Sequence, residues 1–261
     1  MILFEELYIK LESDNLSGSI KDRIVRNILL DYKKKNELKK EVVTASSGNT
    51  GIALSLLQNE FDIKATIFIP KNTLRKINDL IKFFDANVIV VDGDIEDAII
   101  EAKKYAEKND ALYFEQYNNE QNYKTHFDTY YEIIEALPNV EYVITAISTG
   151  GTAMGIAKMA KLNNQNIKVI GVRPDEVSEI PGTTKKNLSS FFDEGLIETH
   201  YVNDVEVKKL EKEIIKKGLF VGPSTVASIL VAKKIKDASK DAVIAVISAD
   251  NGMKYLSDEY N

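Results

Sequence analysis

Short apolar segments rich in β-branched residues alternate with amphipathic stretches along most of the chain. The apolar segments predict strands at 41–46, 65–70, 87–93, 142–148, 168–174 and 242–249. The stretches between them repeat their apolar positions with a period near 3.6, which is typical of amphipathic helices. The clearest helical faces would be formed by Leu74, Ile77, Leu80, Ile81 and Phe84 in 72–87, and by Ile95, Ile99, Ala102 and Ala106 in 95–110. Continuous apolar strands separated by helices indicate parallel sheets buried on both faces, so the sequence predicts an α/β fold.

One long segment, 173–204, departs from this pattern. It has no clean period and contains two of the five prolines. Long irregular segments in compact domains tend to be functional or mobile. The alternation of strand and helix resumes after Asp204 and ends in the strand before Asp250.

The composition restricts the classes of function. The 261 residues suit one or two domains with a sizeable core. The net charge is -6 without a basic block, which argues against nucleic acid as the main partner. The chain has no cysteine and only two histidines, His126 and His200, so a metal site is not expected. The acidic start lacks a signal-peptide pattern, and no stretch approaches the roughly 20 apolar residues of a membrane helix, so we expect a cytoplasmic protein without a membrane partner.

The first loop with candidate chemistry follows the predicted strand 41–46. It contains Ser46, Ser47, Gly48, Asn49 and Thr50, ahead of a helix expected to begin near Ile52. In open α/β sheets, ligands bind beyond the carboxyl ends of the strands. Backbone N–H groups at a helix start, together with hydroxyl groups, make a site for a carboxylate or a phosphate. The alternative is simple N-capping by serine or asparagine, which needs one such residue rather than a run of them.

A second loop follows the predicted strand 142–148. It contains Ser148, Thr149, Gly150, Gly151 and Thr152. A phosphate is the natural ligand of such a hydroxyl-rich glycine turn before a helix, and a plain glycine turn is the alternative. The loop is not a P-loop, because no Gly-Lys-Ser/Thr follows. Asp175 lies about 20 residues further on, as in dinucleotide-binding folds, which leaves an NAD-dependent Rossmann enzyme open.

A lysine in the motif SGSIKDR, residues 17–23, is the remaining candidate. Lys21 stands between a small, flexible run and the charged pair Asp22-Arg23, directly before an apolar helical pattern. In a chain with 34 lysines and arginines, Lys21 is either one more solvated charge or an amine held for chemistry. A further glycine-containing turn, 218–225, places Ser224 as the expected cap of a third helix.

The motifs SGSIKDR, SSGNTG, STGGT and GPSTVAS occur in this order along the chain. In this they resemble the pyridoxal-phosphate (PLP) enzymes of the cysteine synthase and cystathionine β-synthase type, from about residue 9 to residue 257. The segments 114–126, 148–158 and 179–182 look closer to synthases of diaminopropionate precursors for siderophores.

The resemblance implies a two-domain α/β architecture with doubly wound parallel sheets of the tryptophan synthase β-like PLP fold. The smaller, mobile domain would span 14–128, and the larger, cofactor-binding domain would span 1–13 with 129–261. It also implies a homodimer, in line with the predominance of closed two-fold assemblies.

The resemblance also assigns roles to individual residues. Lys21 would form the Schiff base with PLP and, once released, act as the general base on the substrate Cα–H. Asn49 would bind the 3′-oxygen of the cofactor. The 5′-phosphate would be held by Ser148, Thr149, Gly150, Gly151 and Thr152. The substrate α-carboxylate would be held by Ser46, Ser47, Gly48 and Thr50, with Gln116 assisting.

The implied reaction is β-replacement on a serine derivative or cysteine through an aminoacrylate intermediate, with PLP as the electron sink. One alternative is a cysteine lyase that releases sulfide on the same scaffold. Another is a truncated or inactive homologue that still binds PLP. In each case the expected partner is a small amino-acid substrate.

Several features depart from the family pattern. Fewer residues precede Lys21 than is usual, so the N-terminal part is expected to be short. Asp250 or Asn251 stands where relatives have a serine or threonine that contacts the pyridine nitrogen, and the alternative is that Asp250 only ends its strand. The segment 182–188 differs from the glycine-rich loop usual near the substrate. His126 is expected to cap or pack rather than to catalyse, and no chemical role is expected for His200.

Overall fold

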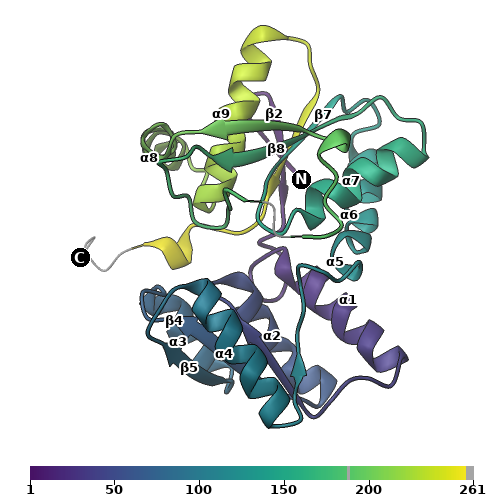
Figure 1. Ribbon diagram of the computed structural model, residues 1–261. Helices are drawn as coiled ribbons and strands as arrows, with labels where there is room; N and C mark the ends of the chain where they lie inside the picture. The colour runs from purple at the N-terminus through teal and green to yellow at the C-terminus, as the bar shows by residue number, and fades with distance from the viewer. Residues whose placement is uncertain (187–188, 257–261) are drawn as a thin grey trace. The chain divides into compact units, whose positions relative to one another are not determined.

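The computed structural model describes residues 1–186 and 189–256, and these form two compact units (Figure 1). The six-stranded unit comprises 1–14 and 122–253, and the four-stranded unit comprises 15–121 with the described part of 254–261. Parallel sheets alternate with helices in both units, which confirms the predicted α/β fold. The expectation of a mobile smaller domain and a cofactor-binding larger domain stays a prediction.

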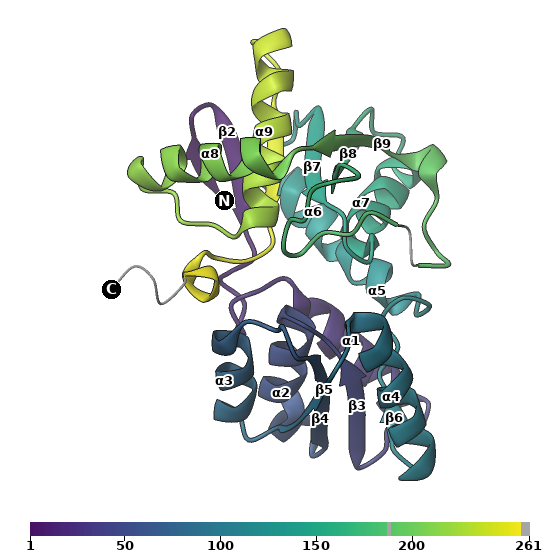
Figure 2. The same ribbon diagram turned by 60° about the vertical axis from the view of Figure 1, so that its left-hand side comes forward.

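The four-stranded unit has an all-parallel sheet in the order β5-β4-β3-β6. Its strands are β3 (Glu41–Ala45), β4 (Lys64–Pro70), β5 (Asn87–Val91) and β6 (Leu112–Tyr113). Its helices are α1 (Lys21–Lys34), α2 (Asn49–Phe61), α3 (Arg75–Phe83) and α4 (Ile95–Lys108). Alternate residues of each strand point to opposite faces. Val42 and Ile67 therefore pack with α1, α2 and α3, whereas Val43 and Phe68 pack with α4 (Figure 2).

The helix α3 is shorter and more exposed than its sequence pattern predicted. Ile77 and Ile81 are buried, but Leu74 precedes the helix and is 45% exposed, and Leu80 is 37% exposed, so only part of the predicted apolar face is buried. The physical reason is position, because α3 lies beside the edge strand β5 and only a narrow stripe of it contacts the core.

The six-stranded unit has the strand order β1-β2-β10-β7-β8-β9, with β1 antiparallel to β2 and the other pairs parallel. Its strands are β1 (Ile2–Phe4), β2 (Leu7–Leu11), β7 (Tyr142–Ala146), β8 (Lys168–Pro174), β9 (Glu198–Val202) and β10 (Ile244–Ser248). Its helices are α5 (Gln121–Lys124), α6 (His126–Ala136), α7 (Gly151–Leu162), η1 (Glu194–Leu196), α8 (Asp204–Lys216) and α9 (Pro223–Ala238). One core cluster joins α8 and α9 to the sheet, and α6 packs with α7 on the opposite face (Figure 2).

All six predicted strands are present, and four others are not found from the sequence pattern. The missed strands are β1, β2, β6 and β9, each five residues or fewer. The expected irregular segment 173–204 contains both η1 and β9. β1, β6 and β9 are short edge strands, and β2 is a five-residue strand that lies between β1 and β10 and includes the charged Lys10. Strands this short give no clear apolar run in the sequence, so their pairing partners decide their conformation.

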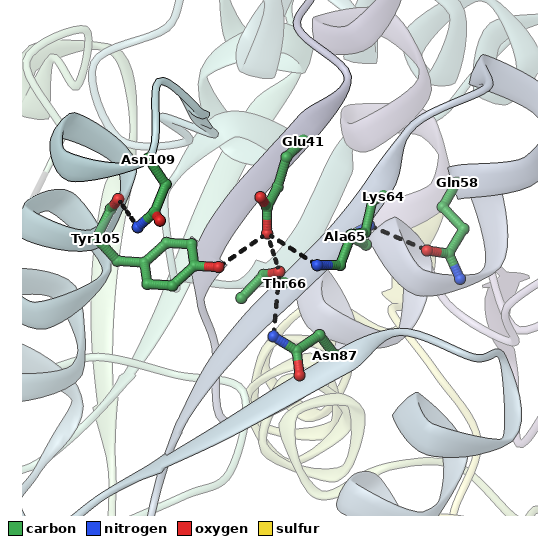
Figure 3. Close-up of polar contacts among 8 residues, drawn as sticks. All are labelled: Glu41, Gln58, Lys64, Ala65, Thr66, Asn87, Tyr105 and Asn109. Atoms are coloured by element: carbon green, nitrogen blue, oxygen red, sulfur yellow. Dashed lines mark hydrogen bonds and ion pairs between the residues drawn. The ribbon is translucent and has the colours of Figure 1, made fainter.

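A polar network ties together the amino ends of β3, β4 and β5 (Figure 3). One carboxylate oxygen of Glu41 accepts hydrogen bonds from the Thr66 hydroxyl at 2.6 Å and the Tyr105 hydroxyl at 3.2 Å. The Lys64 ammonium lies 3.7 Å from the same oxygen, and the Asn87 amide donates to Thr66 Oγ1 at 3.4 Å. The network links three strands and α4 at the amino edge of the sheet, opposite the carboxyl edge where the loop 46–48 leaves β3.

The hairpin β1–β2 turns through Glu5 and Glu6, whose φ angles of 45° and 64° lie in the left-handed region. Such two-residue turns usually contain asparagine and glycine, because a side chain at positive φ is strained. The Glu5 carboxylate binds the ammonium groups of Lys217 and Lys233. These ion pairs connect the turn to α8 and α9 and offset part of the strain.

We expect the contribution of Glu5 to stability to depend on pH. Hydrogen bonds from Lys217 and Lys233 lower the pKa of Glu5 from its ordinary value. A carboxyl group of this kind stabilises the fold above its unfolded pKa and loses that contribution as the pH falls through its folded pKa. Glu5→Gln should therefore lower the free energy of unfolding by up to about 1 kcal/mol at neutral pH, and by progressively less as the pH falls below roughly 4. Urea unfolding at several pH values measures this, and a difference that does not change with pH would contradict it.

Candidate active site

The loops that follow β3 and β6 meet at the carboxyl edge of the four-stranded sheet. The chain runs outward from β3 through β4 to β5 and then returns to β6 on the other side of β3. This reversal is a topological switch point, where open α/β sheets bind ligands. The loop before Asn49 follows β3, and Gln116 follows β6. Sequence-predicted substrate residues therefore share one switch point.

Lys21 lies at the same edge of this sheet. It is the first residue of α1, and the chain leaves the far end of α1 to enter β3 at its amino end. The turn before Lys21 is held by side chains: the Asp22 carboxylate accepts hydrogen bonds from the backbone N–H of Ser17 at 2.7 Å and from the Ser17 hydroxyl. The N–H of Lys21 donates to Ser19 Oγ at 3.3 Å, and Gly18 has a φ of 78°, which favours glycine. These hydrogen bonds fix the backbone of the turn from which the half-buried Lys21 side chain extends.

The Ser46 hydroxyl organises the loop before α2. It accepts hydrogen bonds from the N–H groups of Gly48 at 3.2 Å and Gly51 at 3.1 Å. Helix α2 begins at the N-cap Gly48, where an added Cβ would meet no described atom within 4 Å. By contrast, the N-terminus of α4 is capped by the side chains of Asp94 and Asp97, which form a capping box. The start of α2 therefore keeps space for a ligand at its N–H groups.

Thr50 and Gln116 are joined across the switch point. The buried Thr50 hydroxyl donates to Gln116 Oε1 at 3.0 Å. Because the amide oxygen accepts this bond, the Nε2 donors of Gln116 are directed elsewhere. Asn49 and Ser47 are more exposed, and Asn49 Oδ1 accepts a hydrogen bond from Lys254 in the same unit.

The six-stranded sheet has its own switch point, between β10 and β7. The chain moves outward from β7 through β8 to β9 and returns to β10 on the other side of β7. Loop 148–152 follows β7, and Asp250 and Asn251 follow β10. The second set of sequence-predicted residues therefore shares this switch point. Each half of the predicted site is formed within its own unit.

Two glycines of loop 148–152 have no room for a side chain. Gly150 is the N-cap of α7 with a φ of 81°, and an added Cβ would lie 2.3 Å from the ring of Phe192. A Cβ on Gly151 would lie 1.9 Å from Asn122 Oδ1. The loop therefore presents backbone rather than side chains at the start of α7, as an anion cradle requires.

The hydroxyl groups of this loop are held by buried neighbours. Asn122 Nδ2 donates to Thr149 Oγ1 at 3.1 Å, and Thr152 Oγ1 lies 3.3 Å from His126 Nε2. The other ring nitrogen of the buried His126 lies 3.1 Å from Thr129 Oγ1. His126 thus packs beneath the loop, in agreement with its expected packing role.

Residues 189–193 contact loop 148–152. The Ser189 hydroxyl donates to the carbonyl of Thr149 at 2.6 Å, and the Phe192 ring packs on Gly150. Arg173, at the end of β8, donates to the carbonyls of Thr184 at 2.9 Å and Lys186 at 3.1 Å and stacks on Phe192 at 5.3 Å. Burial lowers the pKa of Arg173 from its usual value. Asn187 and Leu188, which belong to the segment that departs from the family pattern, lie outside the described residues.

Hydrogen bonds hold the residues that follow β10. The carbonyl of Asp250 accepts from the N–H of Gly222 at 3.1 Å and from the Ser248 hydroxyl at 3.3 Å. Asn251 Oδ1 accepts from the N–H of Met253 at 3.1 Å. Asp250 is 1% exposed, and Asn251 is half-buried. Which of the two would face the pyridine nitrogen stays open.

Comparison with known proteins decides the family. A family model described as pyridoxal-phosphate dependent enzyme matches residues 3–250. The chain belongs to this family. The predicted resemblance and PLP as the cofactor are thereby confirmed, and the NAD-dependent alternative loses its support.

Three relatives of this PLP-dependent enzyme illustrate the similarity. The cysteine synthase of Aquifex aeolicus is 33% identical over 97% of this chain and 83% of its own. The crystal structure of cysteine synthase from Entamoeba histolytica has a TM-score of 0.91 at 28% identity, covering 97% of this chain and 81% of its own. A hydrogen sulfide-producing enzyme from Fusobacterium nucleatum has a TM-score of 0.88 at 30% identity, covering 96% and 82%. The expected nearness to diaminopropionate-precursor synthases stays a prediction.

The residues present fit PLP. The cofactor has an anionic phosphate and a 3′-oxygen, and it needs a lysine amine. The backbone cradle at Gly150 and Gly151 suits a phosphate, because added side chains would be excluded there. The four-stranded unit supplies Lys21 and the amide of Asn49 at one sheet edge. The roles of these residues toward the cofactor stay predictions.

Two sequence-based expectations need revision in this PLP-dependent enzyme. The N-cap of α9 is Gly222 with Pro223 following, so Ser224 is not the cap. The Asp175 carboxylate accepts hydrogen bonds from the N–H groups of Val177 and Ser178 and from the amide of Asn203. Hydrogen bonding to the side chains of Ser178 and Asn203 lowers the pKa of Asp175. Asp175 therefore organises the turn after β8.

Sequence reasoning missed the residues that support the site. Lys254 contacts Asn49, and Arg173 contacts Thr184, Lys186 and Phe192. One signal for Arg173 is present in the sequence. It follows the apolar run 169–172 near the end of a predicted strand, and a charged residue in such a position is buried only when it has partners.

Proposed function

We propose that this PLP-dependent enzyme catalyses β-replacement on a serine derivative or cysteine, as the name cysteine synthase describes for its relatives. The observation that carries the proposal is the position of the motifs. Lys21 and the loop 46–50 lie at one switch point, and loop 148–152 lies at the other. The 33% identity with the Aquifex aeolicus cysteine synthase supports the same reaction class.

Lys21 would hold the cofactor through its amine and later accept the proton from the substrate Cα. Bound PLP supplies the electron sink that stabilises negative charge at Cα. The fixed turn of Ser17, Gly18 and Ser19 limits where the amine can reach. A positioned amine close to the Cα–H is the requirement for general-base catalysis.

The two helix starts would bind the two anionic groups. The N–H groups and hydroxyls of Ser148, Thr149, Gly150, Gly151 and Thr152 would hold the 5′-phosphate. Those of Ser46, Ser47, Gly48 and Thr50 would hold the substrate α-carboxylate, with Gln116 assisting through its Nε2. The partial positive charge at the N-termini of α7 and α2 favours both anions. Asp250 or Asn251 would face the pyridine nitrogen.

Release of sulfide from cysteine is the second candidate function. It is favoured by the 30% identity with the hydrogen sulfide-producing enzyme over 96% of this chain. Both reactions need removal of the Cα proton and departure of the β-substituent. They differ in whether a nucleophile then adds at Cβ. A homologue that binds PLP without turnover remains the third outcome.

A product assay distinguishes β-replacement, sulfide release from cysteine, and PLP binding without turnover. The purified, PLP-loaded protein is incubated with cysteine alone, and with O-acetylserine or O-phosphoserine plus sulfide. Cysteine formed from the serine derivatives supports β-replacement, whereas sulfide and pyruvate from cysteine alone support the lyase. Mass spectrometry of products with other nucleophiles then defines the acceptor. If no product forms under any of these conditions, the proposed reactions are wrong.

We also propose a homodimer in the cytoplasm. Closed two-fold dimers are the commonest assembly of soluble enzymes. In the described ranges, 1–186 and 189–256, no helix has the length and apolar character needed to cross a bilayer. Light scattering of the purified protein tests the dimer, since a monomer mass at micromolar concentration would contradict it.

A further inference from the structure

Lys254 contacts a residue that is expected to bind the cofactor. It lies in η2 (Met253–Tyr255), after the last strand, and is only 8% exposed. Its ammonium donates a hydrogen bond to Oδ1 of Asn49, the first residue of α2. Both residues belong to the four-stranded unit. A residue from the end of the chain therefore reaches the loop that follows β3.

The chemistry of this contact fixes the orientation of the Asn49 amide. An ammonium group has only donors, so the amide atom that faces it must be the oxygen. The Nδ2 group, which carries the two N–H donors of the amide, is then turned away from Lys254. Without Lys254, the amide could rotate by 180° and present its oxygen instead.

A second effect is electrostatic. The ammonium of the buried Lys254 contacts the Asn49 amide at the N-terminus of α2. Its positive charge and that of the helix start both favour negative charge on an oxygen bound by Asn49. Bonds from charged donors are stronger than bonds between neutral groups, so the contact holds Asn49 firmly.

We propose that Lys254 is a positioning residue that makes Asn49 a hydrogen-bond donor to the 3′-oxygen of PLP. This proposal rests on the proposed function. Lys254 acts through Asn49 and is not a catalytic residue. The consequence is that the end of the chain contributes to cofactor binding and to the electronic state of the cofactor.

The test compares Lys254→Met, Lys254→Gln and Lys254→Arg. The affinity for PLP is measured by absorbance titration of the apoprotein, together with the long-wavelength band of the bound cofactor. Lys254→Met should weaken PLP binding about tenfold, the effect of one lost charge-assisted hydrogen bond, and should reduce that band. Lys254→Arg should restore both properties, and Lys254→Gln should restore affinity more than the band, because it donates without a charge.

Lys76→Met is the matched control. Lys76 donates to the carbonyl of Leu256 and so contacts the same terminal segment without touching Asn49. It should leave the affinity and the band unchanged. Equal effects of Lys254→Met and Lys76→Met would mean that the segment is merely anchored, which overturns the proposal.

A double-mutant cycle makes the test specific to Asn49. In an Asn49→Ala background, Lys254→Met should have little further effect on PLP affinity, because the group it orients is gone. Additive effects would overturn the proposal. If the wild-type protein binds no PLP, or if borohydride reduction of the PLP-loaded protein labels a lysine other than Lys21, the proposed function is wrong and this inference is wrong with it. If Lys21 is labelled but Lys254→Met has the PLP affinity and the absorbance band of the wild-type protein, only this inference is wrong.

Discussion

Lys21→Ala should abolish covalent attachment of PLP and lower turnover by roughly a thousandfold or more. The amine is expected both to bond the cofactor and to move the Cα proton, and a positioned general base alone contributes about 10²–10⁴-fold. The proposed phosphate cradle of loop 148–152 does not include Lys21, so weaker, noncovalent binding of PLP should remain. Borohydride reduction followed by peptide mass spectrometry measures the attachment, and the product assay measures turnover.

Lys34→Ala is the control for this result. Lys34 lies in the last turn of the same helix, α1, and is exposed, so its replacement tests the loss of a lysine from α1 without touching the expected site. It should leave labelling and turnover unchanged. Normal turnover of Lys21→Ala would show that the amine at this position is not the reactive one.

Gly150→Ala should have the second largest effect, because it reshapes the phosphate cradle. An L-residue at a φ of 81° is strained by about 1–2 kcal/mol. The added Cβ would also lie 2.3 Å from the Phe192 ring, so either the ring or the loop must move. We expect PLP affinity to fall at least about tenfold, since each misplaced N–H of the cradle loses a charge-assisted hydrogen bond. Absorbance titration of the apoprotein measures the affinity.

Gly218→Ala separates backbone strain from the cradle. Gly218 follows α8 with a φ of 88°, and an added Cβ would meet nothing within 4 Å. The positive φ should therefore cost each variant about 1–2 kcal/mol of free energy of unfolding, and the contact with Phe192 adds a further cost in Gly150→Ala alone. Only Gly150→Ala should lose PLP affinity. If Gly218→Ala weakens PLP binding as much as Gly150→Ala does, the effect is general destabilisation and the cradle assignment is contradicted.

Most strands next to the candidate site were predicted from the sequence, and β6, which precedes Gln116, is the exception. β3, β4, β7, β8 and β10 are buried on both faces, so each is a continuous apolar run that local pattern identifies. The turns after β3 and β7 are rich in glycine and hydroxyl residues, as sites where backbone approaches an anion usually are. For this reason, the sequence predicts anion sites at loops 46–50 and 148–152.

The supporting contacts could not be predicted in this way. Whether Leu80 on α3 is buried depends on what lies beside the edge strand β5, and no local period records that. The same holds for Arg173, whose partners are two carbonyls and a ring in a segment without a regular pattern.

The sequence alone determined that this chain alternates strands and helices, that it resembles PLP-dependent enzymes, and which turns are the candidates for a reactive amine or an anion site. These properties depend on residue types at short range. Only the tertiary structure decided which turns share a switch point, because strand order follows from the crossovers and not from the content of each strand. It also decided that Lys254 contacts Asn49, 205 residues away. Contacts between distant residues arise when the burial of many apolar side chains brings the elements together, and a single polar pair leaves no periodic trace in the sequence.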